Sequence, residues 1–305
     1  MKEERPLFAF FGHHKGATDW FNSILSQLCS ELKLTFAVVH YPEMFNGDLQ
    51  KFVAENKIDF LSYDNADYAY VSQLDHYQGF HVVRDPRDIC VSAYFSHLHS
   101  HGTKRAYWAE QRAALQSMSK TDGLLYEMKC RKQQFTEMYT WNYQQSNVLE
   151  LRMEEVTQNP YKHLVQILSF LDLVDTSSSS VKKRFQYCLY SGLRRLEVRS
   201  NGYLALPAAP SRLPVERLLG IVWENDFAKK ARKRNPGEEN IRSHYRKGIA
   251  GDWKNHFEAV HLDYFHRHYS ALLLKLAYEW DPDWWQLCDV QQTDQERVLA
   301  ALGLP

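Results

Sequence analysis

Short apolar runs rich in aromatic and β-branched residues recur along the first half of the chain and predict buried parallel strands. They span residues 7–11, 35–39, 58–61, 80–83 and 148–151. Helical periodicity is found between and after them, over residues 18–30, 87–101, 107–119, 123–145, 160–171 and 181–194. Because strands alternate with helices, the pattern predicts the α/β class, with a central parallel sheet flanked by helices.

The pattern loosens over residues 197–233, which we interpret as an insertion or a lid. Pro207, Pro210 and Pro214 interrupt this stretch, and helical spacing then returns over residues 215–234 and ends in a basic run. A last helix is predicted over residues 257–280. We therefore expect a single domain over residues 1–288 and a peripheral C-terminal tail over residues 289–305.

Composition narrows the kind of protein. The chain of 305 residues is 44% hydrophobic, enough for a sizeable core. Lys and Arg number 37, as do Asp and Glu, and this balance argues against a nucleic-acid partner. Five scattered cysteines lack metal-ligand spacing and favour a reducing compartment, and no apolar run approaches the ~20 residues of a membrane span. We expect a globular cytoplasmic protein without a membrane or metal partner.

The first strand leads into a loop with the features of a phosphate-binding site. Gly12, Lys15 and Gly16 stand between the apolar run and the helix that is predicted from residue 18. Backbone N–H groups at a helix N-terminus and the helix dipole attract an anion, and Lys15 adds a positive charge. In a Walker A loop the Lys directly follows the second Gly, whereas here Lys15 precedes Gly16. This order weakens a kinase or NTPase interpretation.

Two distant segments offer further groups for an anion. Arg84 ends a predicted strand, and Ser92 follows on a predicted helix. Arg supplies a rigid fork of donors and Ser a hydroxyl, a suitable pair for a second phosphate. Later, Arg246 and Lys247 precede Gly248, where the missing side chain lets backbone N–H groups approach an oxyanion. Together with the first loop, these segments predict one doubly phosphorylated ligand.

At these residues the chain resembles the sulfotransferases that use 3′-phosphoadenosine 5′-phosphosulfate (PAPS) and release adenosine 3′,5′-bisphosphate (PAP). The RKG-x-x-GDWKN-x-F signature of that family is unbroken from Arg246 to Phe257. Arg234, with the PGEE sequence at residues 236–239, is similar to the GR-x-PGEE segment of bacterial members. The resemblance covers nearly the whole chain and implies a P-loop-like nucleotide-binding fold.

The resemblance also implies roles for individual residues. In the family, the first loop binds the 5′-phosphosulfate, its Lys lies at the bridging oxygen and a Trp stacks on adenine, while an Arg and a Ser bind the 3′-phosphate. The expected nucleotide-binding residues are His14, Lys15, Gly16, Ala17, Thr18, Trp20, Arg84, Ser92, Arg234, Arg246, Lys247 and Gly248.

Some positions depart from the family pattern. The usual loop reads Lys-Ser-Gly-Thr-Thr-Trp, whereas Gly16, Ala17 and Asp19 stand at its second, third and fifth places. The carboxylate of Asp19 would repel a phosphate, so we expect it to turn away or to cap the helix. Met153 replaces a Tyr that many members carry beside adenine.

Sulfuryl transfer depends on positioning and on charge stabilisation at the leaving oxygen, the role expected of Lys15. The small-molecule acceptor, a hydroxyl or an amine-type nitrogen, must also lose a proton. Many members use a His after the third strand; Asp64 lies nearest to that place, and His97 is the rival candidate for the base.

Other interpretations remain open at this stage. The chain could be a nucleotide-dependent kinase, or a catalytically impaired protein that only binds PAP. Arg84 could form an ion pair with Asp85 or Asp88, and Trp20 could be a core residue. The oligomeric state is also open.

Overall fold

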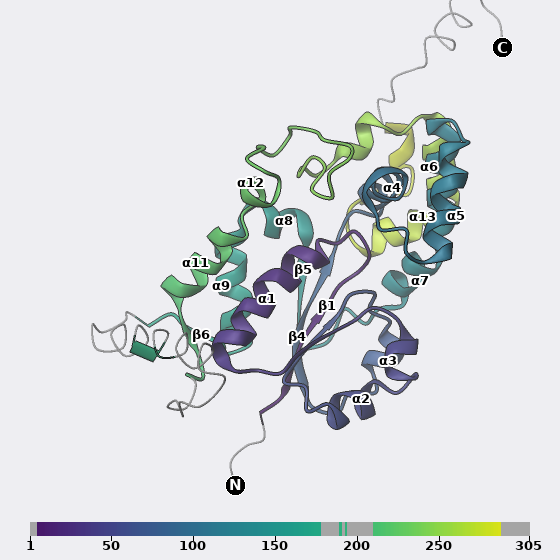
Figure 1. Ribbon diagram of the computed structural model, residues 1–305. Helices are drawn as coiled ribbons and strands as arrows, with labels where there is room; N and C mark the ends of the chain where they lie inside the picture. The colour runs from purple at the N-terminus through teal and green to yellow at the C-terminus, as the bar shows by residue number, and fades with distance from the viewer. Residues whose placement is uncertain (1–4, 178–188, 191–192, 194–209, 288–305) are drawn as a thin grey trace, which may run out of the picture. The chain divides into compact units, whose positions relative to one another are not determined.

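The computed structural model describes residues 5–177, 189–190, 193 and 210–287 (Figure 1). These residues form two compact units, one within Met1–Val83 and Asn142–Lys229, the other within Arg84–Trp141 and Lys230–Pro305. We call them the first and the second unit. The expected single domain stays a prediction. The expected tail, most of the helix predicted over residues 181–194 and the first part of the predicted insertion lie outside the described residues.

The first unit contains a five-stranded parallel sheet in the order β2-β3-β1-β4-β5 (Figure 1). Its strands are β1 (Leu7–Phe11), β2 (Phe36–Val39), β3 (Phe60–Tyr63), β4 (Tyr77–Val83) and β5 (Val148–Arg152). The five predicted strands and the α/β class are therefore confirmed, with small shifts at the strand ends. Because β1 and β4 are neighbours whose connections leave toward opposite sides, the carboxyl end of β1 lies at a topological switch point, where open α/β sheets bind ligands.

Helices cover this sheet, and two short strands form a separate pair. The helices of the first unit are α1 (Thr18–Leu32), α2 (Leu49–Glu55), α3 (Tyr68–Val71), α8 (Met153–Gln158), α9 (Pro160–Phe170) and α11 (Val215–Glu224), with the 3-10 turn η1 (Pro42–Phe45). The strand pair is β6 (Val174–Asp175) with β7 (Leu213–Pro214). The short α12 (Phe227–Lys230) follows α11.

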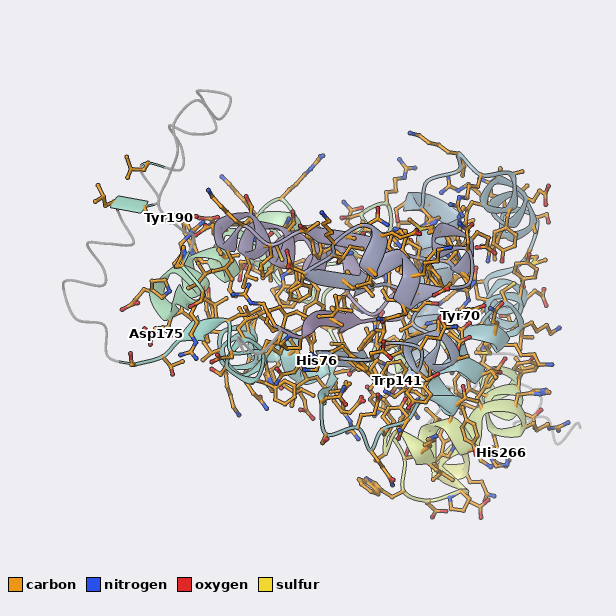
Figure 2. All side chains as sticks on the ribbon, turned by 90° about the horizontal axis from the view of Figure 1, so that it is seen from below. Tyr70, His76, Trp141, Asp175, Tyr190 and His266 are labelled. Atoms are coloured by element: carbon orange, nitrogen blue, oxygen red, sulfur yellow. The ribbon has the colours of Figure 1, made fainter. Side chains whose placement is uncertain are left out.

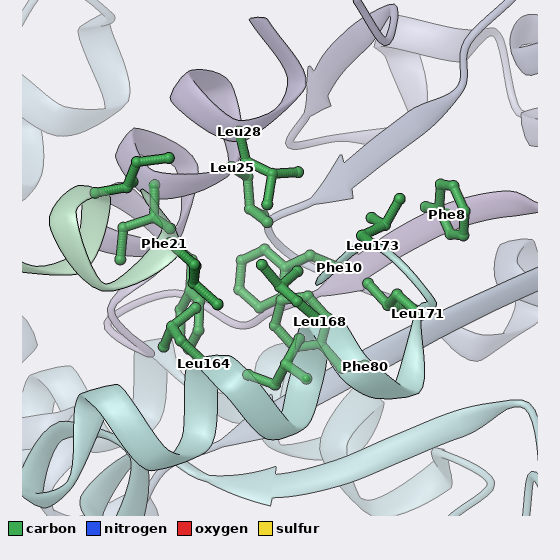
Figure 3. Close-up of a cluster of buried hydrophobic side chains, with 14 of the residues drawn as sticks. Phe8, Phe10, Phe21, Leu25, Leu28, Phe80, Leu164, Leu168, Leu171 and Leu173 are labelled. Carbon is green, nitrogen blue, oxygen red and sulfur yellow. The ribbon is translucent and has the colours of Figure 1, made fainter. Parts of the chain in front are cut away.

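A continuous apolar core joins the sheet to α1, α9 and α11 (Figure 3). Phe10 on β1 stacks on Phe80 of β4, with ring centroids 4.8 Å apart, and lies 4.7 Å from the ring of Phe21 on α1. All three side chains are fully buried. Burying such side chains contributes roughly 1.5–3 kcal/mol each. This core fixes β1 and α1, the two elements that flank the candidate phosphate loop.

The second unit is helical. It contains α4 (Pro86–Phe95), the π-helical turn η2 (Ser96–Ser100), α5 (Ala106–Gln116), α6 (Lys120–Cys130), α7 (Lys132–Thr140), α13 (Ala259–Lys275) and the 3-10 turns η3 (Asp252–Asn255) and η4 (Trp284–Leu287). The single helix predicted over residues 123–145 is wrong. Arg131, with φ −86° and ψ 0°, leaves the helical conformation between α6 and α7. After α7 the chain reaches Trp141, whose side chain is buried (Figure 2).

Among the described residues, no helix combines the length and the apolar character that a membrane span requires.

Candidate active site

The loop between β1 and α1 has an unusual backbone conformation. Lys15 and Ala17 both adopt the left-handed region, with φ of 66° and 63°. This region costs a non-glycine residue roughly 1–2 kcal/mol. The loop is held by two backbone hydrogen bonds: Gly12 N–H donates to the Tyr63 carbonyl at 2.9 Å, and Gly16 N–H donates to the His13 carbonyl at 2.8 Å. Left-handed residues interspersed in a turn direct backbone N–H groups into a concavity that suits an anion.

Both glycines of the loop are required by close packing. A Cβ at Gly16 would lie 2.8 Å from the His13 carbonyl oxygen. A Cβ at Gly12 would lie 2.8 Å from both the Phe10 ring and the Thr18 methyl group. Neither position has a left-handed φ, so space and not backbone conformation selects glycine here.

The loop ends at the N-terminus of α1. The N-cap residue is Ala17, whose methyl group cannot accept a hydrogen bond from the first turn. Thr18 and Asp19 are the first residues of the helix, and the Asp19 side chain is exposed. An N-terminus without a capping side chain keeps its partial positive charge available to a bound anion.

Two buried histidines and a half-buried carboxylate form a chain of polar contacts that begins in this loop. His81 on β4 lies with Nδ1 2.6 Å from the Glu150 carboxylate and Nε2 2.8 Å from Nε2 of His13. Because a carboxylate only accepts hydrogen bonds, His81 donates from Nδ1 to Glu150. Its Nε2 then accepts a hydrogen bond from the Nε2–H of His13. Burial, together with His81, lowers the pKa of His13 well below its ordinary value. His13 is therefore neutral, and its buried Nδ1 has no hydrogen-bond partner.

Trp20 lies in the core of the first unit. Its side chain is 8% exposed, and its indole N–H donates to the Asn225 carbonyl at 2.9 Å. Asn225 directly follows α11. Met153, at the start of α8, packs against the same core. The core role that the sequence left open for Trp20 is thus observed, and stacking on adenine stays a prediction.

Asp64 follows β3 and is almost fully buried, 4% exposed. Its carboxylate accepts two hydrogen bonds from the Asn22 amide, at 3.1 and 3.0 Å, and one from the Ser62 hydroxyl at 2.9 Å. His40, at the end of β2, contacts it through Nδ1 at 3.1 Å. Asp64 is therefore the centre of a polar network at the carboxyl edge of the sheet.

In the second unit, Arg234 organises residues 231–246. All five N–H groups of its guanidinium are used within this segment. They donate to the carbonyls of Ala231, Glu238, Tyr245 and Arg246 and to the hydroxyl of Ser243. This geometry gives Arg234 the role of holding the backbone that carries Arg246. Its expected contact with the nucleotide stays a prediction.

Arg246 and Lys247 are paired with carboxylates. Arg246 binds Glu239 and Asp252 and lies over the Phe95 ring, 4.5 Å from the centroid. The Lys247 ammonium lies 2.6 Å from Asp252. Gly248 and Gly251 both have left-handed φ, 68° and 74°, which glycine adopts without strain.

Asp252 is the common partner of these cations. Burial by itself would raise the pKa of this carboxyl, but hydrogen bonds outweigh burial and lower it. The donors are His256, Lys247, Asn255 and Arg246. Glu239, Asp252 and His256 also offer ligand atoms within 4.8 Å of one another. A metal ion there would have to displace the two cations, so we assign this cluster to the ion-pair network.

The carboxylate of Asp88 on α4 fixes the loop that follows these cations. It accepts hydrogen bonds from the N–H groups of Gly251, at 2.7 Å, and Trp253, at 2.9 Å. Burial raises the pKa of Asp88 to about 6, against the opposing charge of Arg84. Arg84 directly precedes the N-cap of α4 and is buried, and Ser92 is half-buried on the same helix.

Comparison with known proteins identifies the family. A model of the sulfotransferase domain matches residues 10–206, more than half of the chain. The chain belongs to the sulfotransferase family. A comparison with curated protein sequences finds no match.

Solved structures of other proteins resemble this sulfotransferase. A mouse sulfotransferase complexed with PAP has a TM-score of 0.50 and 16% sequence identity, covering 98% of this chain and 89% of the other. That likeness confirms the expected fold. Retinol dehydratase with androsterone and the inactive cofactor PAP has a TM-score of 0.41 and 12% identity, with 88% and 81% covered. Retinol dehydratase with retinol and PAP has a TM-score of 0.37 and 14% identity, with 88% and 82% covered.

His97, the rival base, is part of the packing of this sulfotransferase's second unit. It lies in η2, 2% exposed, with Nδ1 2.7 Å from the Glu127 carboxylate. Gln111 donates to the same carboxylate oxygen at 2.8 Å, and the Trp108 ring lies against His97 at 4.8 Å. Such burial favours a structural role for His97, and its role as a base stays a prediction.

Sequence reasoning missed His40, His13 and His81. His40 and Asp64 are adjacent only because β2 pairs with β3 in the register Val39 with Tyr63. His13 and His81 meet only because β1 pairs with β4, with Phe11 opposite His81. The sequence contained a hint of each pair. His40 directly follows the strand predicted over residues 35–39, and His13 lies two residues after the strand predicted over residues 7–11.

Proposed function

We propose that this sulfotransferase moves a sulfuryl group from PAPS to a hydroxyl or an amine-type nitrogen of a small molecule. The observation that carries the proposal is the left-handed pair of Lys15 and Ala17 at the carboxyl end of β1. This strained backbone suits an anion at the α1 N-terminus. Membership of the family supports the reaction class.

The loop and Lys15 supply the main chemical step. In this proposal the backbone N–H groups of residues 14–18 hold the 5′-phosphosulfate. The acceptor atom forms a new bond to sulfur in line with the bond from sulfur to the bridging oxygen, which breaks. The electron pair stays on that oxygen, and Lys15 stabilises its charge. No covalent intermediate with the protein is needed.

Binding of the 3′-phosphate falls to the second anion-directed group of residues. We assign it to Arg84, Ser92, Arg246, Lys247 and Gly248. Charge-assisted bonds from Arg are shorter and stronger than neutral ones, and a planar fork suits phosphate. The mouse sulfotransferase structure of the same fold contains bound PAP, which supports PAP as the product here. Arg234 then acts indirectly, by holding the segment of Arg246.

We further propose that the protein works in the cytoplasm on small molecules. The cysteines within the described residues, Cys29, Cys90 and Cys130, are free thiols. Burial raises the pKa of both Cys29 and Cys90, so these thiols stay protonated and unreactive. Free packed thiols suit a reducing compartment.

Mass spectrometry tests the reaction. The full chain is incubated with PAPS and with separate pools of alcohols, phenols and guanidinium compounds. We expect one class to gain about 80 Da, the mass of the sulfuryl group whose transfer defines the reaction. The same pools with Lys15→Ala protein are the control. A wild-type protein that binds PAP yet modifies no pool would contradict the proposed activity, and ATP-dependent phosphorylation of any pool would favour a kinase.

A further inference from the structure

His40 and Asp64 form a pair that the strand register creates. Val39 ends β2 opposite Tyr63 of β3, so the next residues of the two strands lie side by side. The Asp64 N–H donates to the Val39 carbonyl at 2.9 Å, which extends the pairing by one step. Nδ1 of His40 then lies 3.1 Å from the Asp64 carboxylate.

The two side chains differ in access to solvent. The Asp64 side chain is 5% exposed and the His40 side chain is 45% exposed. The Asp64 oxygens already accept hydrogen bonds from Asn22 and Ser62, which hold the carboxylate in place. A substrate reaches the imidazole far more readily than the carboxylate. The carboxylate is thus suited to orient a base and not to act as one.

The pair adjoins the phosphate loop within the same unit. The end of β3 and the segment after it are hydrogen-bonded to Gly12: the Gly12 N–H donates to the Tyr63 carbonyl, and the Ala66 N–H donates to the Gly12 carbonyl at 2.9 Å. Asn22, which binds Asp64, lies on α1 one turn after Thr18. Asp64 is therefore connected to both ends of the loop. His40 is fixed as well, because its carbonyl accepts from the Asn65 amide at 2.9 Å.

We propose that His40 is the proton acceptor of the transfer reaction and that Asp64 is its positioning residue. This inference rests on the proposed sulfotransferase function. Asp64 accepts a hydrogen bond from the Nδ1–H of the neutral imidazole. In this tautomer the basic lone pair is on Nε2. As the acceptor's oxygen or nitrogen bonds to sulfur, its proton passes to Nε2, while the bridging oxygen departs with PAP. The imidazolium later returns the proton to water.

The assignment changes the role expected from the sequence. Asp64 lies where many members of the family carry a His, and the sequence alone made it the candidate base. The structure instead supplies a His from the neighbouring strand and uses Asp64 to hold it. Tyr41, whose ring centroid lies 6.1 Å from that of His40, and Met44, whose sulfur accepts a hydrogen bond from the backbone N–H of His40, are among its neighbours.

The first test compares His40→Ala, Asp64→Asn and the control His76→Ala. His76 is an exposed histidine that precedes β4, at the opposite edge of the sheet. The probe is PAPS with water as acceptor, and the readout is inorganic sulfate released; PAP affinity is measured by calorimetry. We expect His40→Ala to lower the rate about 100-fold or more and Asp64→Asn about tenfold, with PAP affinity changed less than about twofold. The His76→Ala rate should equal the wild type.

The pH profile separates positioning from structure. In Asp64→Asn the negative charge beside the imidazole is lost, so the acidic limb of the rate profile should move to lower pH. The same shift should appear in the titration of the His40 ring signal by NMR of histidine-labelled protein, which needs no substrate.

Three results would overturn the assignment. One is a His40→Ala protein that binds PAP and keeps the wild-type rate. Another is an Asp64→Asn protein that loses more activity than His40→Ala, since Asp64 would then be the base. The third is a His40 NMR titration that Asp64→Asn leaves unmoved. A wild-type protein that does not bind PAP would instead contradict the proposed function, and the NMR titration would still decide whether the pair exists.

Discussion

We propose that the loop between β1 and α1 and the basic segment, residues 234–252, both bind anions, but the two regions are built by different means. The loop is shaped by its backbone: two left-handed residues, two tightly packed glycines and a helix N-terminus. The basic segment is shaped by charge. Arg246 and Lys247 share the carboxylate of Asp252, and Arg234 donates to backbone carbonyls and to the Ser243 hydroxyl.

The difference predicts how each region responds to change. The loop's N–H groups are positioned before any ligand binds, so an added atom or a shifted backbone should disrupt it. The cations of the basic segment are already paired with the Asp252 carboxylate. The free energy that a phosphate gains by binding them is therefore only the excess of its attraction over that of Asp252. We therefore expect Lys15 to affect mainly turnover, the backbone of the loop to affect nucleotide binding through its shape, and the basic segment to affect mainly affinity.

Lys15→Ala should produce the largest effect. Loss of one group that stabilises developing charge typically costs ~3–4 kcal/mol, so kcat should fall about 100- to 1000-fold. PAP affinity should fall less than about tenfold, because backbone N–H groups still hold the phosphate. Steady-state kinetics and calorimetry measure the two quantities. Equal losses in kcat and in PAP affinity would show that Lys15 acts only in binding.

Arg246→Ala should give the opposite pattern. Removing a charge-assisted bond costs roughly 1.5–3 kcal/mol, so PAP affinity should fall about 10- to 100-fold while kcat at saturating PAPS changes little. Calorimetry at two salt concentrations should also show a weaker salt dependence than the wild type. Arg267→Ala, which removes an exposed Arg paired with Asp263 on α13, is the matched control and should leave PAP affinity unchanged.

Gly16→Ala tests the backbone-built loop directly. The new Cβ would meet the His13 carbonyl oxygen at 2.8 Å, and a backbone atom cannot move aside without shifting the loop. We expect a loss of roughly 1–2 kcal/mol in PAP binding, or about tenfold. The control is Gly102→Ala, since no atom lies within 4 Å of a Cβ there. Unchanged PAP binding in Gly16→Ala would mean that the loop is not shaped as described.

The smallest effect concerns pH and His13. Its folded-state pKa lies below the unfolded value, so the unfolded chain binds more protons as the pH falls below about 6.5. The stability of the folded protein should therefore decline as the pH falls through that value. Urea unfolding measures the free energy of unfolding at pH 7.5 and at pH 5.5. The decrease between the two pH values should be about 1 kcal/mol smaller in His13→Gln than in the wild type. Identical drops in both proteins would assign the pH dependence to other groups.

Much of the fold is predictable because it is encoded locally. Each strand of the parallel sheet appears as an apolar run, so all five strands are predicted, and the inner strands β1, β3 and β4 are the most deeply buried. The helices α2 and α3 are not predicted, since seven and four residues are too few to show periodicity, although each begins at an Asp N-cap. The break between α6 and α7 at Arg131 is also not predicted from the sequence, because no Pro or Gly lies there.

The sequence predicts candidate site residues only where they belong to a motif of consecutive residues. The loop around Lys15 and the Arg246 signature are such cases. The contact of His40 with Asp64 depends on strand register, which joins residues far apart in the sequence. The role of Arg234 depends on the directions of backbone carbonyl groups, which the pattern of side chains in the sequence does not predict.

The central claim is that one nucleotide with phosphates at both its 3′ and 5′ positions is recognised by this chain. Calorimetry with PAP, adenosine 5′-monophosphate and ATP tests it most directly. Loss of the 3′-phosphate removes charge-assisted bonds worth roughly 1.5–3 kcal/mol, so PAP should bind at least about tenfold more tightly than either competitor. Equal affinity for PAP and adenosine 5′-monophosphate, or a preference for ATP, would contradict the account.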